Sequence, residues 1–213
     1  MKEPAKRKRA KSAPRSDYHH GDLANALVQT TLEIVEASGA EGFSLRDATE
    51  RCGVAVSSAY KHFATRSALL LAVSDLGFEA LCKRIDARVA RATRGLSGVA
   101  KAEATLVELG RTYILFALDR PHLFRLMYGS AQRDDRREAR PAAEVARKLV
   151  AGIDEVLRER GQDRSELSTH KVVAWSLVHG FAVMALDGLW QKRGRELDAM
   201  IDALGAAMLR SLR

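Results

Sequence analysis

The apolar residues of this 213-residue chain recur every three or four positions, as on one face of an α-helix. No segment shows the strict apolar–polar alternation that is typical of a strand. A first helix is predicted over about 22–38 and ends at Gly39. A fourth helix, which begins at Arg66 after Thr65 as its N-cap, carries two apolar stripes. We therefore expect this helix to leave one hydrophobic core and to enter a second.

A different pattern occupies residues 42–66, which read GFSLRDATERCGVAVSSAYKHFATR. Ser44 is the expected N-cap of a short helix, with Asp47 at the capping-box position. Gly53 and Val54 break the run before a second short helix. Two short helices joined by a glycine turn predict a helix-turn-helix unit, whose second helix enters a DNA major groove.

The remaining pattern predicts five more helices beyond a breaker cluster at 95–98, with a charged loop at 130–140. They are a helix that ends before Pro121, a short one over 122–128, one that ends at Gly161, one from Ser165 or Ser168 to about 190, and one through 197–212. The prediction is an all-α fold of about nine helices. It divides into a disordered basic arm at 1–16, a three-helix head at 17–77 with its motif at about 44–63, and a larger helical domain at 78–213.

Composition supports a folded protein in a reducing compartment. Hydrophobic residues make up 46% of the chain, which is enough for a core. The two cysteines, Cys52 and Cys82, lie in different helical patterns without CxxC pairing and suggest buried thiols. The basic start lacks an apolar stretch that would mark a secretory signal, and no run is long enough to predict a membrane span. We expect a cytoplasmic protein that does not associate with a membrane.

The formal net charge of +8 is unevenly distributed. Residues 1–16 hold seven Lys and Arg residues against Glu3 alone. This arm either follows DNA phosphates or serves as a solubilising tail, and the sequence leaves both interpretations open. The helix-turn-helix region is nearly balanced in charge, so a DNA-binding function depends on where its few cations lie.

Several short motifs together resemble the tetracycline-repressor (TetR) family of bacterial regulators. They are YHHGDL at 18–23, GAEGFSLRDA at 39–48, CGV at 52–54 and AYKHF at 59–63. A shorter motif, Trp175-x-x-Val178-His179-Gly180 after RPHLFRLMYG at 120–129, resembles one subgroup of that family. The resemblance implies an all-helical homodimer that binds a double-stranded DNA operator and a small-molecule effector, with ligand binding and dimerisation in the C-terminal domain.

The resemblance also implies roles for individual residues of the head. Arg46 would reach a base edge, for which its fork suits guanine, and Arg66 would meet a phosphate at a helix N-terminus. Tyr60 would anchor a phosphate, although it is also a candidate for plugging the small core. Ala55 replaces the serine that often caps the recognition helix in this family, so we expect this helix to order more fully on DNA. The whole expected DNA-binding set is Ser44, Arg46, Val56, Ser57, Ser58, Tyr60, Lys61, His62 and Arg66.

Two further sets are expected in the C-terminal domain. An apolar pocket between the fourth, fifth, seventh and eighth helices would be lined by Phe78, Leu81, Tyr113, Phe116, Met127, Tyr128, Trp175, His179 and Met184, although the same residues also suit a plain core. Small residues on the last two helices favour a two-fold interface, with a completed monomer core as the alternative. The expected interface set is Gly180, Ala185, Gly188, Leu197, Ile201, Leu204 and Met208.

Other chemistry finds little support in the sequence. His19 and His20 are adjacent, and neither an i, i+4 histidine pair nor a third ligand lies nearby, so no metal site is predicted. No nucleophile–base constellation or phosphate loop appears, so we expect neither an enzyme nor a cofactor. His179 is either a hydrogen-bonded core residue or a group that orients a ligand.

The function expected is a repressor released from a palindromic operator by a small hydrophobic ligand. An activator, an architectural DNA-binding protein without effector, and an enzyme or carrier that lost DNA binding remain the alternatives.

Overall fold

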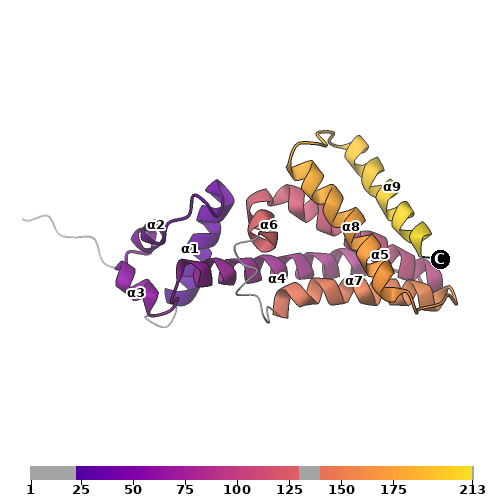
Figure 1. Cartoon of the computed structure of the whole chain (residues 1–213), viewed down its shortest axis with the longest axis horizontal. Coiled ribbons are helices and arrows are strands. Elements are labelled where there is room, and N and C mark those ends of the chain that lie inside the picture. Colours follow the sequence, from indigo (N-terminus) through magenta and orange to yellow (C-terminus); the bar gives the residue numbers. More distant parts are fainter. Residues whose placement is uncertain (1–22, 130–139, 213) are drawn as a thin grey trace, which may run out of the picture.

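A computed structural model describes residues 23–129 and 140–212 of the chain, and within these ranges it is entirely helical. Figure 1 shows a small head formed by the first three helices, a long α4 that runs out of it, and a larger bundle around the far part of α4. The described helices are α1 (Leu23–Ser38), α2 (Leu45–Arg51), α3 (Val56–Tyr60), α4 (Arg66–Ala92), α5 (Gly98–Asp119), α6 (Pro121–Tyr128), α7 (Arg140–Glu159), α8 (Leu167–Leu186) and α9 (Arg195–Ser211). The predicted all-α fold of about nine helices is confirmed over these residues.

The short helices of the head begin and turn at residues that the sequence already indicates. The Ser44 hydroxyl accepts a hydrogen bond from the Asp47 backbone N–H at 3.4 Å and so caps α2. Gly53 then takes a φ of +68°, which a residue with a side chain rarely adopts, and this allows the tight turn into α3. Ala48 and Ala59 are fully buried where α2 and α3 pack on α1. The helix-turn-helix arrangement therefore rests on small residues that let short helices approach closely.

Helix α4 belongs to both parts of the molecule (Figure 1). Its N-cap is Thr65, whose hydroxyl accepts from the Ala68 N–H at 3.0 Å, as expected. Leu69 and Val73 are fully buried near the head, whereas Leu81 and Ile85 are buried farther along in the larger bundle. Helix α4 thus packs in both regions as expected, but its buried residues belong to one continuous hydrophobic cluster and not to two separate cores.

The larger bundle is organised around α5. This helix packs against α4, α7, α8 and α9, and α6 lies between α5 and the head. Close approach is helped by glycines: a Cβ added to Gly205 on α9 would lie 3.0 Å from Val107 of α5. The apolar stripe of α9 is turned toward α5, so Leu197, Ile201 and Met208 are buried within the single chain.

Some expectations differ from the structure or fall outside it. Helix α8 starts at Leu167, with Glu166 as an N-cap that makes no side-chain hydrogen bond, and it ends at Leu186. Neither expected cap, Ser165 or Ser168, holds that position, because Ser165 bonds instead to the Asp163 carboxylate. The basic arm at 1–16, the YHHGDL motif before Leu23, His19 and His20, and most of the charged segment at 130–140 lie outside the described residues. Within the described residues, no helix has the length and apolar character needed to cross a membrane.

Candidate nucleic-acid interface and effector pocket

The α2–turn–α3 unit presents an exposed polar surface. Arg46 on α2 and Lys61 and His62 just after α3 are all exposed to solvent. Val56, at the start of α3, exposes 37% of its surface, and Tyr60 exposes 54%. Tyr60 therefore does not plug the core, and it is available to a partner together with the nearby cations.

The three serines of the expected set differ in how free they are. Ser57 is exposed at the beginning of α3, and Ser58 is half-buried. The Ser44 hydroxyl is already engaged as the cap of α2. A capping hydroxyl at a helix N-terminus lies where backbone N–H groups also point outward, a favourable position for a phosphate.

Arg66 is held by the head itself. Its guanidinium donates to the backbone carbonyl oxygens of Ala40 and Phe43, which lie in the connection between α1 and α2. The sequence assigned this arginine to a phosphate, whereas the described contacts give it the role of joining the start of α4 to that connection. A guanidinium has five N–H donors, so bonding to the two carbonyl oxygens and contacting a phosphate would use different donors of the same side chain.

Ala55 occupies the N-cap position of α3 without any side-chain hydrogen bond, as the sequence indicated. Helix α3 spans only five residues, Val56–Tyr60. A short helix without a side-chain cap has little local stability of its own, and it depends on packing through Ala59.

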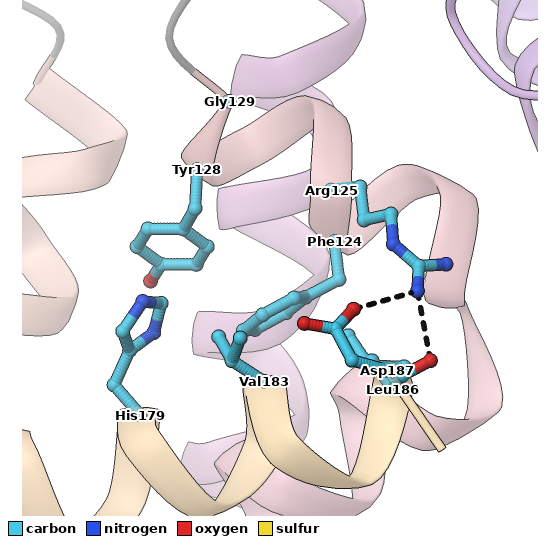
Figure 2. Close-up of a pocket in the computed structure, with 8 residues that line it drawn as sticks. All are labelled: Phe124, Arg125, Tyr128, Gly129, His179, Val183, Leu186 and Asp187. Atoms are coloured by element: carbon cyan, nitrogen blue, oxygen red, sulfur yellow. Dashed lines mark hydrogen bonds and ion pairs between the residues drawn. The ribbon is translucent and has the colours of Figure 1, made fainter. Parts of the chain in front are cut away.

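A cavity of about 320 Å³ opens between α6 and α8 (Figure 2). At one end, the Arg125 guanidinium donates to the Leu186 carbonyl at 2.8 Å and to the Asp187 carboxylate at 3.2 Å. The remaining wall is made mainly of rings and aliphatic side chains. The lining residues are Phe124, Arg125, Tyr128, Gly129, His179, Val183, Leu186 and Asp187.

Behind this cavity lies a cluster of aromatic rings. The Tyr113 hydroxyl on α5 lies 2.8 Å from Nδ1 of His179 on α8. Trp175, one helical turn before His179, stacks on the imidazole with ring centroids 5.3 Å apart and planes 16° apart. Burial lowers the pKa of His179 below its ordinary value. The pKa of Tyr113 is raised, mainly by burial and to a lesser extent by the neighbouring Tyr128. The imidazole and the phenol are therefore both neutral near neutral pH.

The predicted pocket residues separate into three groups. Tyr128 and His179 line the α6–α8 cavity, while Tyr113 and Trp175 support it from the aromatic cluster. Met184 points outward and is 47% exposed. The other predicted residues, Phe78, Leu81, Phe116 and Met127, are buried in the core.

The sequence prediction missed several lining residues that share simple helical spacing. Phe124 lies one turn before Tyr128, and Val183 lies one turn after His179. Residues four positions apart lie on the same face of a helix, so the predicted residues Tyr128 and His179 could have pointed to Phe124 and Val183 from the sequence alone. The pairing of Arg125 with Asp187 was not visible, because these residues are far apart in the chain.

The expected dimer residues also separate. Ala185, Leu197, Ile201 and Met208 are buried in the single chain, so they are not free to contact a second copy. Gly180 faces open space, since a Cβ added there would have no neighbour within 4 Å. Leu204 is half-buried, and Gly188 is exposed in the turn after α8.

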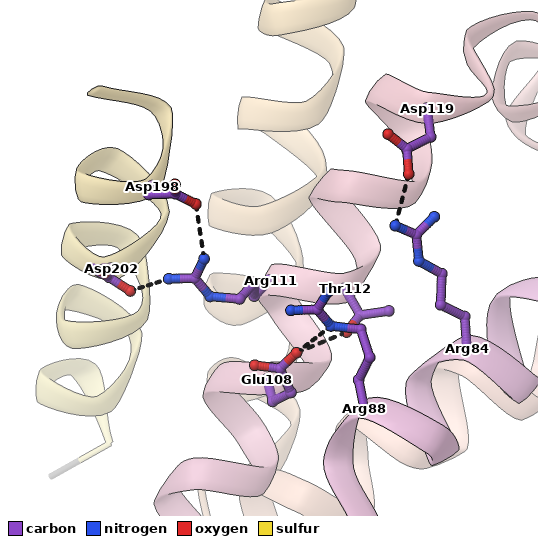
Figure 3. A network of polar contacts seen from close by, with 8 residues as sticks. All are labelled: Arg84, Arg88, Glu108, Arg111, Thr112, Asp119, Asp198 and Asp202. Atoms are coloured by element: carbon purple, nitrogen blue, oxygen red, sulfur yellow. Dashed lines mark hydrogen bonds and ion pairs between the residues drawn. The ribbon is translucent and has the colours of Figure 1, made fainter. Parts of the chain in front are cut away.

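Ion pairs connect α5 to the helices on either side of it (Figure 3). Arg84 and Arg88 of α4 pair with Asp119 and Glu108 of α5. Arg111 of α5 reaches both Asp198 and Asp202 of α9. These pairs hold the bundle in register, and each cation has a structural partner. Among the described residues, no group of three or more His, Cys, Asp or Glu side chains is placed to hold a metal ion.

Comparison with known proteins agrees with this geometry. The family described as bacterial regulatory proteins, tetR family, matches residues 27–73. The family described as tetracyclin repressor-like, C-terminal domain, matches residues 106–208. No curated protein matches the chain.

Solved structures share the fold over nearly the whole chain. A protein of unknown function from Rhodococcus sp. RHA1 is 27% identical, with a TM-score of 0.77, over 92% of this chain and 98% of that one. The multidrug binding protein EbrR, solved with imidazole, is 21% identical, with a TM-score of 0.58, over 93% of this chain and 96% of that one. The transcriptional regulator FadR from Bacillus subtilis, solved with stearoyl-CoA, is 14% identical, with a TM-score of 0.57, over 88% and 96% of the two chains.

The two family matches cover the helix-turn-helix head and most of the larger bundle, in the order in which the structure places them. Regulators of this family bind DNA and are generally not enzymes. The chain belongs to the tetR family of bacterial transcriptional regulators, with a ligand-binding C-terminal domain.

Proposed function

We propose that this regulator is a repressor that leaves a palindromic operator when a small, largely apolar molecule enters the α6–α8 cavity. The observation that carries the proposal is the position of α6. Phe124 and Tyr128 of this helix line the cavity, and other residues of the same helix contact α1 and α4. A ligand that displaces α6 therefore acts on the two helices that set the position of the reading head.

The contacts of α6 with the head and with α4 are close. The Arg120 guanidinium, just before α6, pairs with Glu36 near the end of α1. A Cβ added to Gly39 would lie 3.3 Å from Nδ1 of His122, and one added to Gly77 would lie 2.7 Å from Sδ of Met127. Such tight packing transmits small shifts, although a ligand acts only to the extent that it prefers the DNA-free arrangement.

We propose a homodimer because the outer face of α8 carries exposed apolar side chains. Val172 is 64% exposed and Met184 is 47% exposed, and Gly180 between them faces open space. These positions share one stripe, and Ala199, Ala203 and Ala206 form an exposed small-residue stripe on α9. Two copies joined at these faces would place two reading heads for two half-sites. The buried positions Leu197, Ile201 and Met208 would support this face from within.

The subgroup motif and the relatives support an effector site in the same place. Trp175, Val178, His179 and Gly180 make the Trp-x-x-Val-His-Gly sequence, and we assign the chain to the subgroup on that basis. FadR binds stearoyl-CoA and EbrR binds imidazole, so this fold accommodates small molecules in other proteins. For this chain, the ring-lined cavity favours a compact apolar ligand.

Binding-site selection with the purified full-length chain, starting from its own promoter region, tests the operator. We expect a palindrome with half-sites about one helical turn apart. Arg46→Ala combined with Lys61→Ala should weaken operator affinity by about tenfold or more, because a base contact and a phosphate contact are lost. The matched control is Lys83→Ala with Arg94→Ala, which removes one exposed cation from the far part of α4 and one from the turn just after it. Equal affinities of the two double variants would contradict the assigned reading surface.

The salt dependence of binding separates the repressor from an architectural protein. A repressor should prefer its palindrome over random DNA of the same length at every salt concentration. An architectural protein should show little sequence preference and a steep loss of affinity with salt.

Analytical ultracentrifugation tests the homodimer. The sedimentation coefficient of Gly180→Arg should shift toward that of a monomer, whereas that of Ala90→Arg, on the exposed side of α4, should not.

A further inference from the structure

The hydrogen bond between Tyr113 and His179 determines what the cavity can recognise. His179 lines the cavity, whereas Tyr113 is buried behind it, and only 2.8 Å separates the phenol oxygen from Nδ1. One of the two imidazole nitrogens is thereby occupied. The properties of the other nitrogen, Nε2, then follow from the direction of this hydrogen bond.

The direction follows from acid–base chemistry. A neutral imidazole has one N–H donor and one acceptor nitrogen, and its acceptor nitrogen is much stronger than a phenol oxygen. A phenol is in turn a good hydrogen-bond donor, and the Tyr113 hydroxyl lies 2.8 Å from Nδ1. Tyr113 therefore donates to Nδ1, which puts the ring proton on Nε2.

The surrounding rings hold that proton in a defined place. Trp175 stacks on one face of the imidazole, and the rings of Tyr128 and Phe124 lie with centroids 5.0 and 5.9 Å from it. Figure 2 shows the side chain of Tyr128 pointing toward His179, with its hydroxyl beside the imidazole ring. A donor that is already oriented costs a ligand little ordering entropy.

The charges of the cavity cancel. Arg125 is paired with Asp187 and also caps the Leu186 carbonyl at the end of α8 (Figure 2). An anionic ligand would compete with Asp187 for Arg125, and a cationic ligand would compete with Arg125 for Asp187. Both side chains are about half exposed, so the pair itself contributes little, but together they carry no net charge and attract neither an anion nor a cation; the lining therefore favours a ligand without net charge.

We infer that the effector is an uncharged, aromatic or unsaturated molecule that carries a hydrogen-bond acceptor, such as a carbonyl oxygen, for the Nε2–H of His179. This inference deepens the proposed function and rests on it, because it concerns the same cavity. It also explains why tryptophan and histidine stand one helical turn apart on α8: the tryptophan holds the plane of the ring that makes the hydrogen bond.

The first test needs no ligand. Long-range proton–nitrogen NMR on the full-length chain with ¹⁵N-labelled histidine distinguishes the two tautomers, and the His179→Gln spectrum assigns the signal. We expect the Nε2–H tautomer in the wild type at neutral pH. A ring protonated on Nδ1, or on both nitrogens, would overturn the inference.

The second test uses four naphthalene probes of similar shape in titration calorimetry. They are 2-acetylnaphthalene, with an acceptor; 2-isopropenylnaphthalene, without one; 2-naphthoate, an anion; and trimethyl(2-naphthyl)ammonium, a cation. The ketone should bind about tenfold more tightly than the alkene, because the alkene would cover the Nε2–H without giving it an acceptor. Both ions should bind more weakly than the ketone. Equal affinity for ketone and alkene, preference for an ion, or no binding of the ketone would each refute it.

Two variants link the preference to the hydrogen bond. Tyr113→Phe keeps the ring and removes the donor, so the ratio of ketone to alkene affinity should fall at least severalfold. Thr112→Val removes the neighbouring buried hydroxyl on α5, which lies near Glu108 instead, and should keep the wild-type ratio. A ratio unchanged in Tyr113→Phe would refute the role of Tyr113. Operator binding without ligand is measured separately, so a failure of DNA recognition would be distinguished from a failure of this inference.

Discussion

The Arg66 guanidinium lies over the ring of Phe43, with Cζ 5.3 Å from the ring centroid, and donates to the Phe43 carbonyl at 3.2 and 3.3 Å. Phe43 is itself buried in the head. One side chain at the start of α4 therefore fastens the connection between α1 and α2. The head is held to α4 by this contact as well as by its apolar core.

Arg66→Ala should destabilise the protein by about 1–2 kcal/mol, because charge-assisted hydrogen bonds and a cation–π contact are lost together. Urea unfolding followed by circular dichroism measures the change. Arg46→Ala is the matched control, since Arg46 is exposed and should leave stability within about 0.5 kcal/mol. If Arg66→Ala instead weakened DNA binding at full stability, its main role would be contact with phosphate.

Ala55→Ser should stabilise α3, because serine supplies the side-chain cap that this helix lacks. The gain should be about 1 kcal/mol, visible as slower amide exchange at 56–61 in the free protein. Ala64→Ser, in the exposed turn before α4, should leave exchange at 56–61 unchanged.

In the wild type, the same amides should exchange more slowly on operator DNA than without it, because DNA orders a helix that is weakly capped. Equally strong protection in the free and bound states would show that α3 is fully formed without DNA.

Gly77→Ala should loosen the contact between α4 and α6. Its Cβ would approach Met127 Sδ to 2.7 Å and Leu123 Cδ1 to 3.1 Å. The expected cost is about 1–3 kcal/mol, reduced to the extent that the flexible Met127 side chain moves away. Thermal unfolding measures it, with Ser67→Ala as the control, because this residue is exposed in the first turn of the same helix. Equal melting temperatures for the two variants would show that α6 yields without strain.

Acidification should destabilise the C-terminal domain through His179. Burial lowers the pKa of this ring, so below about pH 6.5 the unfolded chain binds a proton that the folded protein resists. Stability is therefore fully present above the ordinary pKa and is lost as the pH falls toward the lowered one. Tyr113, which faces the ring and whose pKa burial raises, is neutral in this range and does not oppose the trend.

Urea unfolding at about pH 7.5 and about pH 5.5 measures the loss, and His179→Gln should show a smaller one. Identical losses in the wild type and in His179→Gln would place the acid sensitivity elsewhere in the molecule.

Local order was predictable to the extent that it depends on neighbours in the chain. Ser44 and Thr65 cap α2 and α4 as expected, and Gly53 makes the turn before α3. These features involve atoms only a few residues apart, so residue type and spacing suffice. The start of α8 was predicted incorrectly, because the Ser165 hydroxyl donates to the Asp163 carboxylate and does not cap the helix.

The sequence by itself therefore determined the helices, their caps, the helix-turn-helix unit and the exposed position of Arg46, since helical periodicity is a local property. Only the tertiary structure decided what covers each apolar face. It turned Leu197 and Met208 inward, engaged Arg66 with Phe43, and joined Tyr113 of α5 to His179 of α8 beside a cavity formed by α6. The physical reason is that an apolar stripe shows which face of a helix must be buried but not which other helix covers it. The covering helix depends on how all the helices pack together.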